Sequence, residues 1–188
     1  MGTLRIWRVF ALSAVAASVA VAQHKPQDFA KSLAPYVVSS QEVVERMLEV
    51  AGVRPGETVY DLGCGDGRIL IMAARQFRAK AVGIEISDSL VRSTSDRILK
   101  MGLQNDVEVI HGDLLNVDLN PADVVTLYLT TNLNESLRPN LERYLKPGAR
   151  VVSHEFRVPG WKPNRVEKTD SPSHPHVIYL YIMPPNKK

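Results

Sequence analysis

The sequence predicts an α/β fold in which seven strands form a mostly parallel sheet, with helices on both faces and an antiparallel last strand. Three observations lead to this prediction. Short β-rich runs alternate with helix-like segments between residues 58 and 153, which is typical of a parallel sheet covered on both faces. A glycine-rich turn follows the first of these runs directly. The chain then closes with two β-like runs, 165–169 and 176–183, and the short loop between them indicates an antiparallel pair.

An amphipathic helix is expected ahead of the first strand. Ser40 and Gly52 bracket residues 41–51, and serine and glycine are preferred directly before and after a helix. This helix would pack its apolar face on the sheet. Its apolar side chains recur at the three- and four-residue intervals of one helical face, at Val43, Val44, Met47, Leu48 and Ala51.

From residue 58 onward the expected elements follow in a regular order. A chain of 188 residues has room for one domain with a proper core. Turn signals such as Pro147-Gly148 separate the elements. The expected strands cover 58–62, 81–86, 107–110, 123–129 and 149–153, and the expected helices lie near 68–77, 89–101 and 135–145.

The first residues have the pattern of a targeting segment. Arg5 and Arg8 precede the uncharged run 9–22, which ends Ala20-Val21-Ala22. A basic start, a short apolar stretch and an A-x-A ending predict a secretory signal peptide, and hence an exported protein. The run is shorter than the ~20 residues of a comfortable membrane span. An uncleaved membrane anchor beginning at Ile6, with the domain in the cytoplasm, is the alternative.

The chain therefore divides into a leader, a linker and a domain. Residues 1–22 form the signal peptide or anchor, residues 23–35 are polar with two prolines and form a linker, and residues 36–188 form the domain. The leader holds two of the 23 basic residues and none of the 20 acidic ones, which leaves 21 against 20. That near balance, without a block rich in lysine and arginine, does not indicate a nucleic-acid partner. No feature of the sequence specifies an oligomeric state.

Cys64 is the only cysteine of the chain. A single cysteine excludes an internal disulfide and a zinc site built from several cysteines, and no metal site is predicted. Its position between two glycines favours a small side chain that fills a tight turn. We therefore interpret Cys64 as a packing residue in preference to a reactive thiol.

A glycine-rich loop stands where the first strand of the sheet ends. Its sequence is Gly63-Cys64-Gly65-Asp66-Gly67, and Asp61 precedes it. Glycines permit positive φ and let a ligand approach the backbone, while the helix that follows offers free N–H groups. The third glycine comes one residue too early for the G-x-G-x-x-G dinucleotide fingerprint, and no Gly-Lys-Ser/Thr follows as in a P-loop. D-x-G-x-G-x-G is instead typical of enzymes that use S-adenosylmethionine, whose sulfonium and ammonium cations suit nearby acidic residues.

Two further acidic residues follow the next strands. Glu85 ends the second strand among apolar neighbours, where it can accept hydrogen bonds from both ribose hydroxyls of the cofactor. Asp113 follows the third strand, where its carboxylate can accept from the adenine amino group. His111 either lines the same pocket or is an ordinary loop residue. Asp66 and Arg68 are close enough in sequence to form a local ion pair.

Together with the seven strands and the closing hairpin, these motifs match the methyltransferase version of the Rossmann-like fold. The chain further resembles the small protein-lysine methyltransferases that modify the ATP synthase c-subunit and the adenine nucleotide translocase, with their bacterial relatives. The resemblance covers about residues 35–163. It rests on Pro35-Tyr36-Val37, 59–68, Gly83-Ile84-Glu85, Gly112-Asp113-Leu114, Tyr128-Leu129-Thr130, Leu137-Arg138-Pro139, 145–153, Phe156 and 159–163.

The resemblance implies an S-adenosylmethionine-dependent methyltransferase with a protein lysine as its acceptor, and it implies that Tyr36 closes over the cofactor. The chain departs from the family at Val38-Ser39, where a Pro-Thr pair would be typical, so the N-terminal lid differs in detail. The export-like leader also differs from a mitochondrial one, so the family's protein substrates are not carried over. The residues implied to hold the cofactor are Asp61, Gly63, Gly65, Glu85 and Asp113.

The acceptor side of the site carries fewer signals. Many amine- and amide-methylating enzymes have Asn/Asp-Pro-Pro-Tyr after the fourth strand, and residues 127–132 lack it. Tyr128 and Thr130 are the candidates for orienting an amine. His154-Glu155 is either a base for O-methylation or a structural pair, and Trp161 either closes the acceptor pocket or caps the core. A small-molecule N- or O-methyltransferase and a non-catalytic S-adenosylmethionine-binding domain are the alternative functions.

Overall fold

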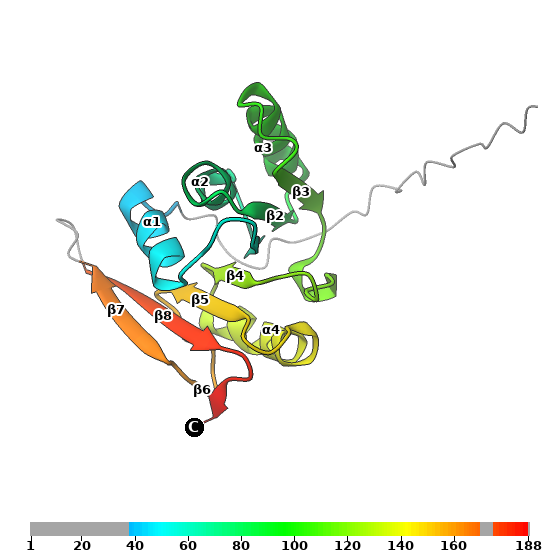
Figure 1. The fold of residues 1–188 in the computed structure, drawn as a ribbon. Coiled ribbons are helices and arrows are strands. Elements are labelled where there is room, and N and C mark those ends of the chain that lie inside the picture. The colour runs from blue at the N-terminus through cyan, green and yellow to red at the C-terminus, as the bar shows by residue number, and fades with distance from the viewer. Residues whose placement is uncertain (1–37, 170–174, 188) are drawn as a thin grey trace, which may run out of the picture.

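The computed structural model describes residues 38–169 and 175–187, and a seven-stranded sheet forms their centre (Figure 1). The strand order is β3-β2-β1-β4-β5-β8-β7. Strands β1 to β5 pair in parallel, whereas β8 is antiparallel to both of its neighbours, β5 and β7. The strands are β1 Thr58–Leu62, β2 Lys80–Glu85, β3 Val107–His111, β4 Val124–Leu127, β5 Arg150–His154, β7 Arg165–Thr169 and β8 His176–Ile182.

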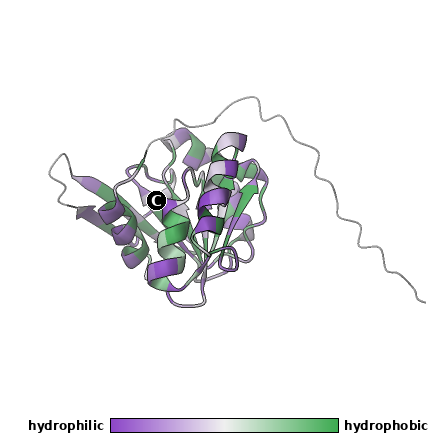
Figure 2. Cartoon of the chain, turned by 90° about the horizontal axis from the view of Figure 1, so that it is seen from above, coloured by the Kyte–Doolittle hydropathy of each residue, from purple (hydrophilic) through white to green (hydrophobic). Residues whose placement is uncertain are grey.

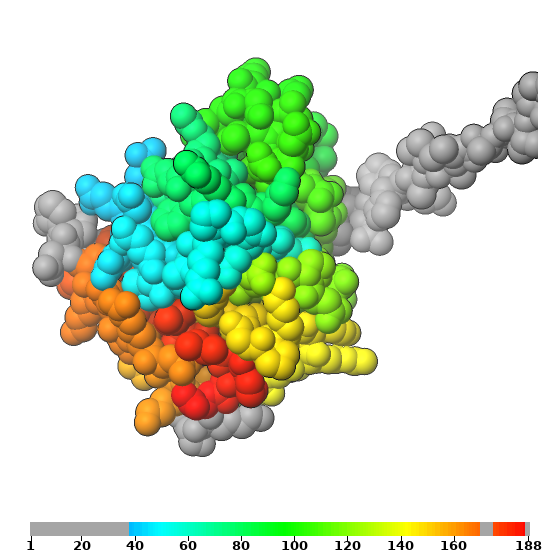
Figure 3. Space-filling view, viewed as in Figure 1, coloured from blue at the N-terminus to red at the C-terminus, as the bar shows by residue number. Residues whose placement is uncertain are grey.

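Helices cover both faces of the sheet (Figure 1). Helices α1, α2 and α3 lie over one face, and α4 lies over the other beside the 3-10 turn η1. In the space-filling view, α1 fills the space between α2 and the β8 side of the sheet (Figure 3). These elements are α1 Gln41–Val50, α2 Arg68–Phe77, α3 Asp88–Lys100, η1 Leu114–Asn116 and α4 Thr131–Tyr144, and a two-stranded sheet pairs β6 Trp161–Lys162 with β9 Asn186–Lys187.

The strands contribute to two hydrophobic clusters, one on each face of the sheet. Neighbouring residues of a strand point to opposite faces. In β1, Val59 therefore joins the cluster under α1 and α2, while Tyr60 joins the cluster under α4, and in β8 Ile178 and Tyr179 divide in the same way. Figure 2 shows the apolar strands in green between helices whose outward sides are hydrophilic. Both faces of the sheet are thus buried, as expected for near-continuous apolar strands.

The predicted fold class is confirmed, and most element ends agree to within a residue or two. Helix α4 is the exception, since it begins at Thr131 and not near Glu135. The hydroxyl of Thr130 accepts a hydrogen bond from the first turn of α4 and so starts the helix early. The strand expected over 123–129 is accordingly shorter, at Val124–Leu127. The pairing of β6 with β9 was not predicted, because two-residue strands are too short to show a periodic pattern.

Several predicted features lie outside the described residues. These are the signal peptide or anchor of residues 1–22, the linker of residues 23–35, and Tyr36, and they stay predictions. In the part of the chain that the structure describes, no helix is both long enough and apolar enough to span a membrane.

The strand order reverses beside β1, which has β2 on one side and β4 on the other. The chain that leaves β1 turns into α2 on one face of the sheet, whereas the chain that leaves β4 turns into α4 on the opposite face (Figure 1). Diverging connections of this kind open a crevice beyond the carboxyl ends of the strands. The fold therefore places its ligand site at the point where the glycine-rich loop follows β1.

Next to this point, β2 passes so close to the glycine loop that Gly83 has no room for a side chain. A Cβ added at Gly83 would lie 2.6 Å from Cys64 Sγ and 2.5 Å from Leu70 Cδ1. Cys64 is itself buried, and burial raises the pKa of its thiol. The thiol is thus held protonated and packed, which agrees with the interpretation of Cys64 as a packing residue.

Gly83→Ala is expected to lower the free energy of unfolding by about 1–3 kcal/mol, because the added methyl group overpacks the contact between β2 and the loop. Gly112→Ala is a matched control, since its φ is not positive and a Cβ there would meet no atom nearer than 3.8 Å. Chemical denaturation of both variants measures the difference. Equal stability of the two variants would contradict the close packing at Gly83.

Candidate active site

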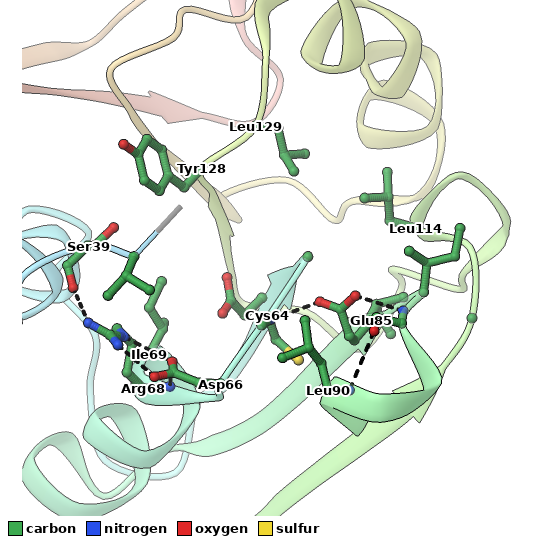
Figure 4. A pocket seen from close by; sticks show the side chains of 18 of the residues that line it. Ser39, Cys64, Asp66, Arg68, Ile69, Glu85, Leu90, Leu114, Tyr128 and Leu129 are labelled. Carbon is green, nitrogen blue, oxygen red and sulfur yellow. Dashed lines mark hydrogen bonds and ion pairs between the residues drawn. The ribbon is translucent and has the colours of Figure 1, made fainter. Parts of the chain in front are cut away.

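A cavity of about 510 Å³ opens at the carboxyl ends of the parallel strands. This volume is in the usual range for a small-molecule site. As Figure 4 shows, its walls come from the loops after β1 to β4 and from the segment before α1. Most of the predicted site residues meet there, namely Asp61, Gly63, Gly65, Glu85, Asp113 and Tyr128.

The glycine loop forms the floor of the cavity. Gly63, Gly65 and Gly67 have φ angles of 85°, 53° and 72°, which is the left-handed region that glycine adopts without strain. A Cβ at Gly67 would also lie 2.5 Å from Thr94 Cγ2 of α3. The hydroxyl of Thr94 donates a hydrogen bond to the carbonyl of Gly65 at 2.8 Å, so α3 fixes the loop from beneath. Helix α2 starts directly after the loop, with its positive end beside the cavity.

The carboxylate of Glu85 braces this loop. One of its oxygens accepts a hydrogen bond from the backbone N–H of Gly65 at 2.9 Å, and the other accepts from the N–H of Ser87 at 2.8 Å. The side chain is buried against protein and still lines the cavity. Each carboxylate oxygen has a second lone pair. Glu85 therefore combines its role in the loop with the capacity to accept hydrogen bonds from two hydroxyl groups of a ligand.

Asp61 brings a nearly inaccessible carboxylate to the cavity, with an exposed fraction of 3%. It lies in β1 and accepts a hydrogen bond from the hydroxyl of Thr126 in β4 at 2.7 Å. Burial raises the pKa of Asp61 to about 7, against the hydrogen bond from Thr126 and with a contribution from the charges of Glu85 and Asp66. A buried carboxylate of this kind favours a cationic ligand, which would repay the loss of hydration.

The predicted ion pair between Asp66 and Arg68 is confirmed, and it does more than join two neighbours. Arg68 Nε lies 2.9 Å from Asp66 Oδ1 and Arg68 Nη2 lies 2.6 Å from Asp66 Oδ2, and this two-point contact lowers the pKa of Asp66. Arg68 also donates a hydrogen bond to the backbone carbonyl of Ser39, just before α1. The guanidinium thus ties the N-terminal segment to the glycine loop at the edge of the cavity (Figure 4).

Asp113 lines the cavity from the loop after β3. Its two carboxylate oxygens accept hydrogen bonds from the N–H of Leu115 at 2.9 Å and from the side-chain amide of Asn116 at 3.0 Å. These contacts fix its orientation and leave one lone pair on each oxygen for a ligand. His111 instead places Nε2 3.0 Å from the carbonyl oxygen of Ile86, and it is not among the described residues that line the cavity.

The two residues predicted to orient an acceptor differ in position. Tyr128 lines the cavity, and its ring lies against that of His154, with 4.1 Å between centroids and 39° between the ring planes. Burial raises the pKa of the Tyr128 phenol, with a further contribution from Glu155, so the hydroxyl stays protonated at neutral pH. Thr130 caps α4 and does not belong to the cavity lining, so its position gives the prediction for Thr130 no support.

Two other predicted candidates lie behind the cavity wall. His154 is fully buried, its ring contacts that of Tyr128, and it is not among the described residues that line the cavity. Trp161 is buried in the core, where its indole N–H donates to Glu142 at 2.8 Å and its ring meets Tyr181 edge-on at 5.3 Å. Of the two roles considered for Trp161, the structure therefore supports core packing.

Sequence reasoning missed the apolar part of the lining. These residues share the spacing of ordinary core positions, so no signal in the sequence distinguishes them from the core. Thr126 was missed too, although a hydroxyl inside the buried run Val124–Leu127 does mark a position that needs a polar partner. The apolar lining consists mainly of Ile86, Leu90, Leu114, Leu129 and Leu133.

A solved structure shares this arrangement. The structure of an RNA methyltransferase from Salinibacter ruber in complex with S-adenosyl-L-homocysteine superposes with a TM-score of 0.74 at 42% sequence identity. The match covers 79% of this chain and 94% of that chain. The strand order, the glycine loop after β1 and the acidic pocket together define an S-adenosylmethionine-dependent methyltransferase.

The family can be stated as well. Residues 61–165 match the ANTKMT methyltransferase domain. A protein-lysine N-methyltransferase of Saccharolobus islandicus is 48% identical over 154 residues, which cover 81% of this chain and 96% of that protein. The adenine nucleotide translocase lysine N-methyltransferase of Mus musculus is 36% identical over 138 residues, or 72% of this chain and 60% of the mouse protein. The chain belongs to the family of the ANTKMT methyltransferase domain.

Asp61 makes the stability of the cofactor-free protein depend on pH. Its pKa is higher in the folded chain than in the unfolded one, so its contribution to stability is complete below about pH 4 and is lost as the pH rises through about 7. Asp61→Asn keeps an oxygen for Thr126 but cannot ionise. When the pH is raised from about 4 to about 8, the free energy of unfolding of this variant is expected to increase by roughly 3–5 kcal/mol relative to that of the wild type. Denaturant unfolding at both pH values measures this gain, and parallel profiles of the two proteins would contradict it.

Proposed function

We propose that this chain transfers a methyl group from S-adenosylmethionine to the side-chain amine of a lysine in a protein. The observation that carries the proposal is the 48% identity to a protein-lysine N-methyltransferase over 96% of that protein's length. An alignment that spans nearly the whole relative includes both the cofactor end and the acceptor end of the site. The cavity also contains a protonated tyrosine, Tyr128, and apolar walls, and both suit an amine as the methyl acceptor.

The cofactor is proposed to lie across the glycine loop. Glu85 would accept hydrogen bonds from the ribose hydroxyls and Asp113 from the adenine amino group, while Asp61 would face the cationic end. When bound, S-adenosylmethionine supplies a methyl group on an electrophilic sulfonium. The residues fit this molecule, because the carboxylates of Asp61, Glu85 and Asp113 and the open backbone of the glycine loop meet in one cavity with an apolar wall.

At the acceptor end, the chain must hold a neutral amine in line with the methyl group of the cofactor and the sulfur that carries it. A lysine amine has a pKa near 10.4 in water, and transfer into an apolar pocket lowers that value. Leu129 and Leu133 supply such surroundings, and Tyr128 offers a phenol oxygen that can accept a hydrogen bond from the amine and aim its lone pair. Holding the amine nitrogen close to the methyl carbon and aligned with it lowers the barrier of such a displacement. Because the apolar pocket already favours the neutral amine, no strong base is needed.

RNA is the second candidate acceptor, because the Salinibacter ruber protein with 42% identity is described as an RNA methyltransferase. Charge argues against it for this chain. Residues 23–188 carry 21 basic and 20 acidic side chains, and four of the acidic ones, at positions 61, 66, 85 and 113, line the cavity itself. Binding to a phosphate backbone depends on clustered cations. A protein acceptor is therefore preferred.

The proposal for the N-terminus is export with cleavage after Ala22. The support is the basic start, the apolar run and the Ala20-Val21-Ala22 ending. N-terminal sequencing of the protein purified from its own cells tests this, with a start at Gln23 expected. A chain that retains Met1 would instead support the anchored form, which keeps the domain beside the cytoplasmic supply of cofactor.

Incubation of the protein with labelled S-adenosylmethionine and a lysate of its source cells tests the acceptor. Label is expected in polypeptides, at lysines that gain mass in steps of one methyl group. Glu85→Ala is the control that should lose the activity, because the loop brace and the proposed ribose contact are both removed. Label confined to RNA or to small metabolites would overturn the lysine proposal, even if the methyltransferase activity itself is present.

Cofactor affinity should depend on pH through Asp61. A cation beside Asp61 favours the ionised carboxylate, so the affinity for S-adenosylmethionine is expected to rise roughly five- to tenfold between about pH 6 and pH 7.5. Asp61→Asn should bind more weakly and lose this part of the pH dependence. Calorimetric titration measures both proteins. If the pH profile of the variant equals that of the wild type, Asp61 does not face the cationic end of the cofactor.

A further inference from the structure

Three side chains of the types that bind metal ions converge at the corner of β5 and β8, next to Tyr128. His154 Nε2 lies 3.1 Å from His176 Nδ1 and 3.3 Å from Glu155 Oε1, and the distance between His176 Nδ1 and Glu155 Oε1 is 2.7 Å. The three atoms thus form a compact triangle. None of the three residues is among the described residues that line the cofactor cavity, so the triangle is a separate feature.

The backbone is bent to bring these side chains together. Consecutive residues of a strand normally point to opposite faces, which would separate His154 from Glu155. Glu155 has a φ of 62°, in the left-handed region that is unfavourable for a residue with a side chain. This bend at the end of β5 turns the Glu155 carboxylate toward the side of His154. Such strain persists where the surroundings enforce it, and it is concentrated at functional sites.

The third member arrives through the strand register. His154 pairs with Ile178 in the antiparallel ladder, and His176 is two residues from Ile178 on the same face of the sheet. His154 is fully buried, whereas the side chains of His176 and Glu155 have exposed fractions of 13% and 26%. One side of the triangle is therefore anchored in the core, and the other can be reached from solvent.

Hydrogen bonds do not account for all three contacts at once. An imidazole nitrogen carries at most one in-plane proton, and a carboxylate oxygen accepts. If both imidazoles donate to Glu155, the contact between His154 Nε2 and His176 Nδ1 has no lone pair to receive a proton. If one imidazole donates to both of its partners, the two partners face each other with lone pairs, at 3.3 Å when His176 is the donor and at 2.7 Å when His154 is the donor. A cation at the centre uses all three lone pairs.

We propose that His154 Nε2, Glu155 Oε1 and His176 Nδ1 bind a divalent transition-metal ion, with zinc as the best match. Two imidazoles and a carboxylate are common zinc ligands, at about 2.0–2.2 Å from the metal. Ligand atoms at such distances lie about 2.8–3.1 Å apart in octahedral coordination and about 3.3–3.6 Å apart in tetrahedral coordination. The 2.7–3.3 Å of the triangle are closer to the octahedral values. Water would complete the coordination on the exposed side.

The surroundings include the kind of support that metal ligands usually have. The second ring nitrogen of His154, Nδ1, lies 3.3 Å from the hydroxyl of Ser39, which fixes the orientation of the ring. The ring of His154 also contacts that of Tyr128. Both Ser39 and Tyr128 line the cofactor cavity, so an ion held by His154 would stiffen one wall of the active site without touching the cofactor.

The test is zinc binding by the full chain without an affinity tag, measured by competition with a chromophoric chelator. The wild type is expected to bind one zinc ion. His176→Asn and Glu155→Gly should each weaken binding by at least about 100-fold, since even residues that only support metal ligands change affinity by 10–100-fold. Glycine is chosen at position 155 because it adopts the φ of 62° without strain. Cobalt substitution should give visible d–d absorption bands that both variants lose.

His111→Asn is the matched control, because His111 is a partly buried histidine whose ring contacts a backbone carbonyl outside the triangle. Its zinc affinity should equal that of the wild type. Circular dichroism and S-adenosylmethionine binding show whether each variant is folded, and Glu155→Gln replaces Glu155→Gly if the latter is not. A wild type that binds no stoichiometric zinc, or equal affinities in all variants, would overturn the proposal and identify the triangle as a hydrogen-bonded cluster.

Discussion

The pocket depends on one buried carboxylate that serves two loops. Glu85 accepts backbone hydrogen bonds from Gly65 in the loop after β1 and from Ser87 in the loop after β2. Because both loops follow adjacent parallel strands, a single side chain at the end of β2 sets the distance between them. The glycine loop could not lie so close to β2 without the missing side chain of Gly83.

Asp61 illustrates a conflict between stability and ligand binding. The carboxylate is buried next to two other acidic residues, so its ionisation lowers the free energy of unfolding of the cofactor-free protein. A neutral residue would fold more readily at this position, but it would offer nothing to a cationic cofactor. The ionised pocket thus carries negative charge that a cationic cofactor would neutralise. Binding of the cofactor would therefore also stabilise the folded enzyme.

The sequence predicted the sheet, its helices and the glycine loop well, because periodicity and turn residues report local structure. It also placed Asp61, Glu85 and Asp113 at the ends of neighbouring strands, and the structure brings them into one cavity. Local sequence patterns could not predict contacts between residues that are far apart in the chain. The His154–His176 contact depends on antiparallel register, and the tie from Arg68 to Ser39 crosses 29 residues of chain. Neither contact produces a pattern in the spacing of residues along the sequence.

The strand order has a consequence for the growing polypeptide. Strand β8 follows β7 in the chain, yet it is inserted between β5 and β7 in the sheet. During translation, β5 must wait with an open edge, and β7 has no other strand to pair with among the described residues. A nascent chain can therefore complete this part of its sheet only after β8 has been synthesised. Premature termination before residue 176 would release a chain with an unpaired edge, which is prone to aggregation.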